Sequence, residues 1–172
     1  MLTKTRFRIC FITLCASALL GACGGGHDPN SVKKPKLIEF GAPLEAIESK
    51  LNSRCDTLES YPIDPPQFAG LKSQAQIDCT GFAYFGAKRD VEFVFVDGAL
   101  AIAHINVEDS ELPAIEQAFI DTLGTPTHSK DTVLVFADHN TAVRNNPTEV
   151  TFFAAFAAPS LIQSASIRPD RE

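Results

Sequence analysis

The chain has 172 residues, of which 45% are hydrophobic, enough to fill the core of one domain. It carries 15 Lys and Arg residues against 21 Asp and Glu residues, which gives a net charge of −6 at pH 7. This acidity argues against a nucleic-acid-binding protein and against a polybasic segment that holds anionic lipid.

The first 22 residues have the pattern of a secretory signal peptide. An apolar run over residues 9–20 follows a basic start made by Lys4, Arg6 and Arg8. A basic start, a short apolar core and small residues before a cleavage point direct export. The run is shorter than the ~20 residues that span a bilayer. We therefore assign residues 1–22 to a signal peptide that is removed.

The leader ends in Leu20-Gly21-Ala22-Cys23, which resembles the lipobox of bacterial lipoproteins. The resemblance implies that Cys23 receives a diacylglycerol, that cleavage falls just before it, and that the new amino terminus is acylated. Two or three acyl chains anchor a protein stably where one does not. Gly24 is not the aspartate that favours inner-membrane retention, so the resemblance points to the outer membrane, with the domain facing the periplasm. The alternative is a secreted protein cleaved near Ala22.

Processing changes both the cysteine count and the charge. Cys10 and Cys15 leave with the leader and Cys23 carries lipid, so only Cys55 and Cys79 remain. In an oxidising compartment we expect these two to form a disulfide. The alternative is a redox pair or a metal-thiolate site, although no CxxC spacing is present. Loss of three basic residues leaves 12 against 21 acids, a net charge of −9.

The mature chain begins with a segment that has no periodicity. Residues 23–36 are expected to be the lipidated cysteine and a flexible tether, and residues 37–158 a single folded domain. Residues 159–172 are expected to be a loose C-terminal tail.

The first helix is predicted to begin at Pro43 and to end near residues 52–54, because Leu44, Ile47 and Leu51 repeat at helical spacing. Residues 58–75 are rich in proline and are expected to be a long loop closed at its base by the disulfide. Such a loop is either functional or a plain surface connection.

Three strands are predicted next, over residues 77–85, 91–96 and 99–107. Asp97-Gly98 predicts a type I′ hairpin between the last two. This turn sets an expected register in which Val96 opposes Ala99, Phe95 opposes Leu100, and Phe93 opposes Ile102. The bulky face, expected to meet the helices, then carries Val91, Phe93, Phe95, Leu100, Ile102 and His104. The other face, expected to be thinly covered, carries Glu92, Val94, Ala101 and Ala103.

The second half repeats this order. A helix is predicted between a cap at Asp109-Ser110 and a stop at Gly124. Three strands follow over residues 132–137, 141–144 and 149–156. Two units, each a helix followed by three strands, predict an α+β fold with one antiparallel sheet of about six strands and both helices on one face.

Two short motifs and the lipobox carry a resemblance to known folds. Gly41-Ala42-Pro43-Leu44-Glu45-Ala46-Ile47 and Leu123-Gly124-Thr125-Pro126 resemble segments in the helix-plus-sheet units of β-lactamase-inhibitor protein and of small outer-membrane assembly lipoproteins. The likeness extends loosely over residues 37–157. It implies a helix-plus-sheet fold, and no binding residue of those families is carried over by position.

No catalytic, cofactor-binding or metal-binding motif is found in the sequence. His27, His104, His128 and His139 lie in no paired ligand spacing, and neither a GxSxG nor a phosphate-binding loop follows a strand. We interpret His104 as a hydrogen-bonded, half-buried residue, and Asp138 with His139 as a turn, the alternative being a metal or acid–base pair.

Two charged clusters are interpreted as surface features or as contacts for a partner. Lys88-Arg89-Asp90 is placed in an exposed turn, and Arg144 with Glu149 is placed as a surface pair across a hairpin.

These observations predict a lipid-anchored cell-envelope protein that acts as a non-catalytic protein-binding or adaptor module, without a cofactor. The alternatives are a periplasmic enzyme or its accessory subunit, a hydrolase inhibitor, and a binder of lipid or a small ligand. A polar cleft in which a histidine meets a carboxylate favours the enzyme. An apolar patch over Val94, Ala101 and Ala103 favours a protein partner.

Overall fold

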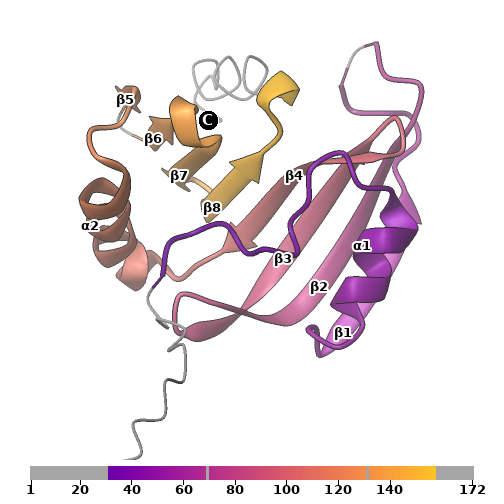
Figure 1. Cartoon of the computed structure of the whole chain (residues 1–172), viewed down its shortest axis with the longest axis horizontal. Coiled ribbons are helices and arrows are strands. Elements are labelled where there is room, and N and C mark those ends of the chain that lie inside the picture. Colours follow the sequence, from indigo (N-terminus) through magenta and orange to yellow (C-terminus); the bar gives the residue numbers. More distant parts are fainter. Residues whose placement is uncertain (1–30, 69, 131, 158–172) are drawn as a thin grey trace, which may run out of the picture.

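The computed structural model describes residues 31–68, 70–130 and 132–157 (Figure 1). The predicted leader, Cys23 and the predicted tail over residues 159–172 lie outside the described residues. Within this part of the chain, no helix has the length and apolar character that crossing a membrane requires.

The prediction of an α+β fold with an antiparallel sheet is confirmed. The first half consists of α1 (Leu44–Leu51), β1 (Thr57–Pro62), β2 (Gln74–Tyr84), β3 (Ala87–Val96) and β4 (Ala99–Asn106). The second half consists of α2 (Leu112–Leu123), β5 (His128–Lys130), β6 (Val133–Phe136), β7 (Thr141–Asn145) and β8 (Thr148–Phe153). The described strands form one sheet in the order β1-β2-β3-β4-β8-β7-β6-β5, so the two halves join where β4 pairs with β8.

The predicted strand number was wrong, because the sheet has eight strands and each unit has four. The two missed strands, β1 and β5, lie at the edges of the sheet. Nearly all their side chains are exposed, so neither shows the alternation of apolar and polar residues that marks a half-buried strand. Residues 58–75 are therefore not all loop, since β1 occupies their first part and β2 their last.

The Asp97-Gly98 hairpin is confirmed, and both residues have positive φ, as a type I′ turn requires. Val96 opposes Ala99 and Phe95 opposes Leu100, as predicted. The next part of the register was wrong, because Phe93 opposes Ala103. An irregularity at Ala101 adds one residue to β4, and such a bulge moves every later side chain to the other face.

Two buried clusters follow from this register. The larger core combines the buried residues of both helices, which are Ile47, Leu51, Ile115 and Phe119, with sheet residues such as Phe93, Ala103 and Phe152. The smaller core lies on the opposite side of the pleat and contains Val94, Ala101, Ile102, Val133, Val135 and Phe153. Val94, Ala101 and Ala103 are at most 6% exposed, so the expected apolar surface patch is not present.

The segment before α1 is packed against the sheet. Val32, in the part of the chain assigned to the tether, is 4% exposed, and the Tyr84 hydroxyl donates a hydrogen bond to its carbonyl oxygen at 3.2 Å. The described chain is thus already tied to the domain at Val32.

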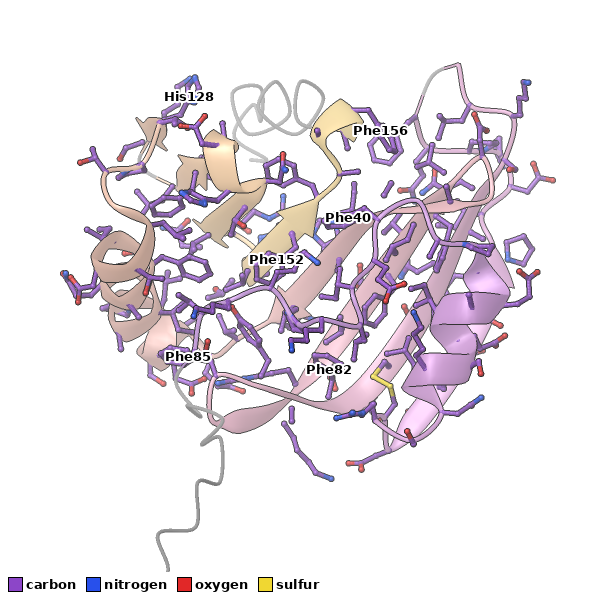
Figure 2. All side chains as sticks on the ribbon, in the orientation of Figure 1. Phe40, Phe82, Phe85, His128, Phe152 and Phe156 are labelled. Atoms are coloured by element: carbon purple, nitrogen blue, oxygen red, sulfur yellow. A yellow bond between two sulfur atoms is a disulfide. The ribbon has the colours of Figure 1, made fainter. Side chains whose placement is uncertain are left out.

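The Cys55–Cys79 disulfide is confirmed, with a Cα–Cα distance of 5.5 Å. It joins the chain just after α1 to β2, and Figure 2 shows it beside α1. Cys79 is buried in the larger core.

Candidate functional site

The register aligns a row of polar residues across half of the sheet. Glu59 of β1 pairs with Asp78 of β2, and Asp78 pairs with Glu92 of β3. Glu92 pairs with His104 of β4, and His104 pairs with Thr151 of β8. Residues paired across neighbouring strands point to the same face. We call the side of the sheet that carries these five residues the polar face. The residues that alternate with them along each strand point to the other side, into the larger core.

His104 lies on the polar face, and its predicted place on the bulky face was wrong. The bulge at Ala101 sets His104 opposite Glu92. Its Nδ1 lies 2.6 Å from Oε1 of Glu149 and 3.1 Å from Oγ1 of Thr151. The interpretation of His104 as a hydrogen-bonded, half-buried residue is confirmed.

Glu149 is the centre of this network. The same carboxylate oxygen lies 2.7 Å from Nη2 of Arg144 and accepts a 2.7 Å hydrogen bond from the Thr151 hydroxyl. The predicted Arg144–Glu149 pair is present, but it is not a surface pair, since the Glu149 side chain is only 4% exposed. The carboxylate therefore ties β4, β7 and β8 together at the junction of the two units.

The pKa of Glu149 is lowered by its partners. Burial acts to raise it, but the hydrogen bond from His104, the charges of His104 and Arg144, and the Thr151 hydroxyl together outweigh burial. The ionised carboxylate is thus the form that this network stabilises.

The other half of the row is acidic and open. Glu59 and Glu92 are exposed and Asp78 is half-buried. Asp78 accepts hydrogen bonds from the Tyr61 hydroxyl at 2.9 Å and from the Gln76 amide at 2.7 Å. Partial burial raises the pKa of Glu92, and the negative charges of Asp78 and Glu149 raise it further. The charge of His104 acts in the opposite direction.

Tyr61 lies beside these carboxylates at the end of β1. Its pKa is raised to about 12 by desolvation, by the hydrogen bond to Asp78, and by the charges of Asp78, Glu92 and Glu59. Tyr61 is 36% exposed. The surface over β1–β3 therefore combines a concentration of negative charge with an accessible aromatic ring.

Arg89 was wrongly placed in an exposed turn, because β3 begins earlier than predicted, at Ala87. The side chain is 4% exposed and forms two contacts with the Glu111 carboxylate, one of them at 2.8 Å from Nη2. The Arg89 guanidinium holds the pKa of Glu111 below its usual range. This pair connects the β2–β3 hairpin to the turn before α2.

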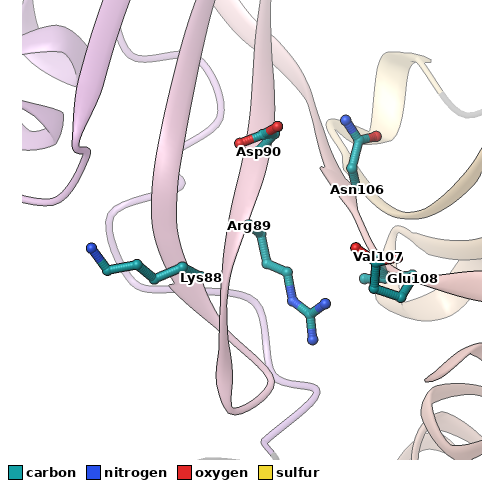
Figure 3. A pocket seen from close by; sticks show the side chains of 6 residues that line it. All are labelled: Lys88, Arg89, Asp90, Asn106, Val107 and Glu108. Carbon is teal, nitrogen blue, oxygen red and sulfur yellow. The ribbon is translucent and has the colours of Figure 1, made fainter. Parts of the chain in front are cut away.

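A hollow of about 140 Å³ lies next to this pair (Figure 3). Its lining consists of Lys88, Arg89, Asp90, Asn106, Val107 and Glu108. Because Arg89 also donates to the carbonyls of Tyr84 and Phe85, at 3.3 Å each, its guanidinium is committed to the fold. The lining residues do not include any histidine.

The other histidines of the described chain are not brought to His104. His128 lies on the exposed edge strand β5, and His139 lies in a short turn between β6 and β7. Within residues 31–157, gaps excepted, no three His, Cys, Asp or Glu side chains gather as metal ligands would. His27 and Cys23, the predicted lipidation residue, lie outside the described part.

Comparisons with known proteins add no relative. Neither family models, nor curated proteins, nor solved structures contain a match to this chain.

Proposed function

We propose that this chain is a lipid-anchored protein of the bacterial cell envelope that binds another protein through the polar face of its sheet. The lipobox-like segment supports an anchor at Cys23 on the outer membrane. The Cys55–Cys79 disulfide is consistent with a domain that works in an oxidising compartment.

The observation that carries the binding role is the open acidic surface over β1–β3. Glu59 and Glu92 are exposed on the sheet, beside the exposed residue Tyr61. A rigid sheet surface with strong charge of one sign steers and orients a partner of opposite charge. The partner that this surface fits is a basic protein.

We also infer that α1 and α2 cover the same face of the sheet. Their buried residues Ile47, Leu51, Ile115 and Phe119 belong to one cluster with Phe93 and Phe152. This arrangement supports the fold analogy and leaves the helices off the polar face. The smaller core covers Val94, Ile102 and Phe153 on that face, so the surface left for binding is the part around Glu59, Asp78 and Glu92.

A periplasmic enzyme is the second candidate, because His104 does meet a carboxylate. However, Oε1 of Glu149 has His104, Arg144 and Thr151 around it, and the guanidinium and imidazole connect three strands. This geometry suits a group that stabilises the unit junction. It gives less support to acid–base chemistry, which needs an imidazole facing bound substrate.

Position-specific photo-crosslinking in intact cells tests the binding role. A photoreactive residue in place of Glu92 should give a discrete adduct with one envelope protein. The same residue in place of Asp121, an exposed carboxylate of α2, is the matched control and should give no such adduct. Equal labelling from both positions, or no adduct from position 92, contradicts the proposal.

A further inference from the structure

The outer edge of β1 leaves backbone groups free to bind. In the part of the chain that the structure describes, β1 pairs with β2 alone. Ile63 donates to Gln74 at 2.9 Å, and residues of an antiparallel pair alternate between facing the partner strand and facing away. Counting back along β1 from Ile63, the outward-facing residues are Pro62, Ser60 and Leu58. Pro62 offers only its C=O group, so Leu58 and Ser60 supply the outward N–H groups.

The edge is long enough and regular enough to accept another strand. Leu58 is half-buried and Ser60 is exposed, and the Ser60 hydroxyl donates to Glu48 of α1 at 2.8 Å. That contact holds β1 against the first helix. By contrast, the opposite edge strand β5 has only three residues.

The side chains next to this edge define what can bind there. Glu59 and Tyr61 point to the polar face, where Asp78 and Glu92 continue the row inward. An added strand places every second side chain beside Glu59 and Tyr61. A Lys or Arg of the added strand that lies beside Glu59 forms an ion pair with the carboxylate, and one that lies beside Tyr61 forms a cation–π contact with the ring. Both interactions favour a basic segment.

We infer that β1 binds an extended, basic segment of the partner protein as an added strand of the sheet. This inference rests on the proposed binding function and specifies how the partner is held. Backbone hydrogen bonds at Leu58 and Ser60 supply the pairing, and Glu59 selects for basic residues.

A second copy of this chain is disfavoured as the occupant. Two β1 edges brought together set Glu59 near its own equivalent, and the net charge of −9 expected for the mature chain adds repulsion. A charged residue on an edge strand can also serve only to prevent that strand from pairing with other chains. The experiment therefore has to distinguish binding of a basic segment at Glu59 from repulsion of all segments.

The direct test measures binding of a short peptide in which lysine alternates with valine to the purified mature protein. Binding should weaken with added salt, and a peptide with glutamate in place of lysine should not bind. N-methylation of the peptide backbone at the pairing positions, which keeps every charge, should weaken binding roughly tenfold. Equal binding of the methylated peptide contradicts strand addition.

Two substitutions and their matched control locate the contact. Ser60→Pro removes an outward N–H without removing a bond to β2, and should weaken binding roughly tenfold. Ser60→Ala loses the same contact to Glu48 but keeps the N–H, and should bind as the wild type does. Glu59→Lys, at an exposed position, should abolish the preference for the lysine peptide. Unchanged binding by Ser60→Pro and Glu59→Lys, with the fold intact by circular dichroism, overturns the inference.

Two outcomes keep this inference distinct from the proposed function. If position 92 gives an adduct but the lysine peptide does not bind at β1, the proposed binding function stands and strand addition is contradicted. Self-association in sedimentation experiments that Ser60→Pro abolishes identifies a second copy as the occupant and overturns the basic partner.

Discussion

Glu149→Ala is expected to lower the free energy of unfolding by about 3–5 kcal/mol, the range for removing one member of a buried ion pair. The substitution leaves Arg144 and His104 without the carboxylate that both contact. It also removes the acceptor of the Thr151 hydroxyl, a residue that is itself 3% exposed. Urea denaturation at neutral pH measures the difference.

Glu59→Ala is the matched control, because it removes an exposed carboxylate from the same face of the sheet. Its effect should stay within about 0.5 kcal/mol, as for most surface substitutions. Equal losses from the two variants contradict the structural role of Glu149.

The pH dependence of the wild type gives an independent readout of the same residue. Because the folded state lowers the pKa of Glu149, its contribution is present above the unfolded value of about 4.3 and is lost as pH falls through the folded value. The wild type should therefore lose more stability than Glu149→Gln on acidification below this point. Parallel pH profiles contradict the assignment.

Reduction of the Cys55–Cys79 disulfide is expected to cost about 3 kcal/mol, the chain-entropy value for a loop of about this length. The two cysteines are separated by 24 residues, and their bond closes the segment that contains β1. Urea denaturation with and without a phosphine reductant measures this cost. The Cys55→Ala/Cys79→Ala double variant is the control and should not respond to reductant. Coincident curves for oxidised and reduced wild type contradict the prediction.

Local signals in the sequence were sufficient for the elements that carry them. Pro43 and the spacing of Leu44, Ile47 and Leu51 gave α1, and Asp97-Gly98 gave the central hairpin. Gly124 ends α2 as predicted, with positive φ. The disulfide followed from cysteine counting once the predicted leader was set aside.

Features that depend on neighbouring strands were missed. The edge strands β1 and β5 have exposed, polar sequences, so only their pairing with β2 and β6 makes them strands. The bulge at Ala101 has no marker such as glycine, and it reversed the faces of Ile102, Ala103 and His104.

The candidate site was missed for the same reason. The sequence distance between His104 and Glu149 gives no sign that their side chains meet, and β4 contacts β8 only because the two units join there. The burial of Arg89 depends in the same way on Glu111, which lies before α2. The acidic row becomes visible only when Glu59, Asp78 and Glu92 are aligned by register.

The proposed placement in the envelope underlies the proposed binding role, the expected disulfide in the cell and the proposed basic partner alike. Mass spectrometry of the protein extracted from membranes of the producing cells tests it most directly. We expect an amino-terminal peptide that begins at an acylated Cys23, together with a peptide pair joined through Cys55 and Cys79. A chain that keeps Met1 and has both thiols free contradicts the account.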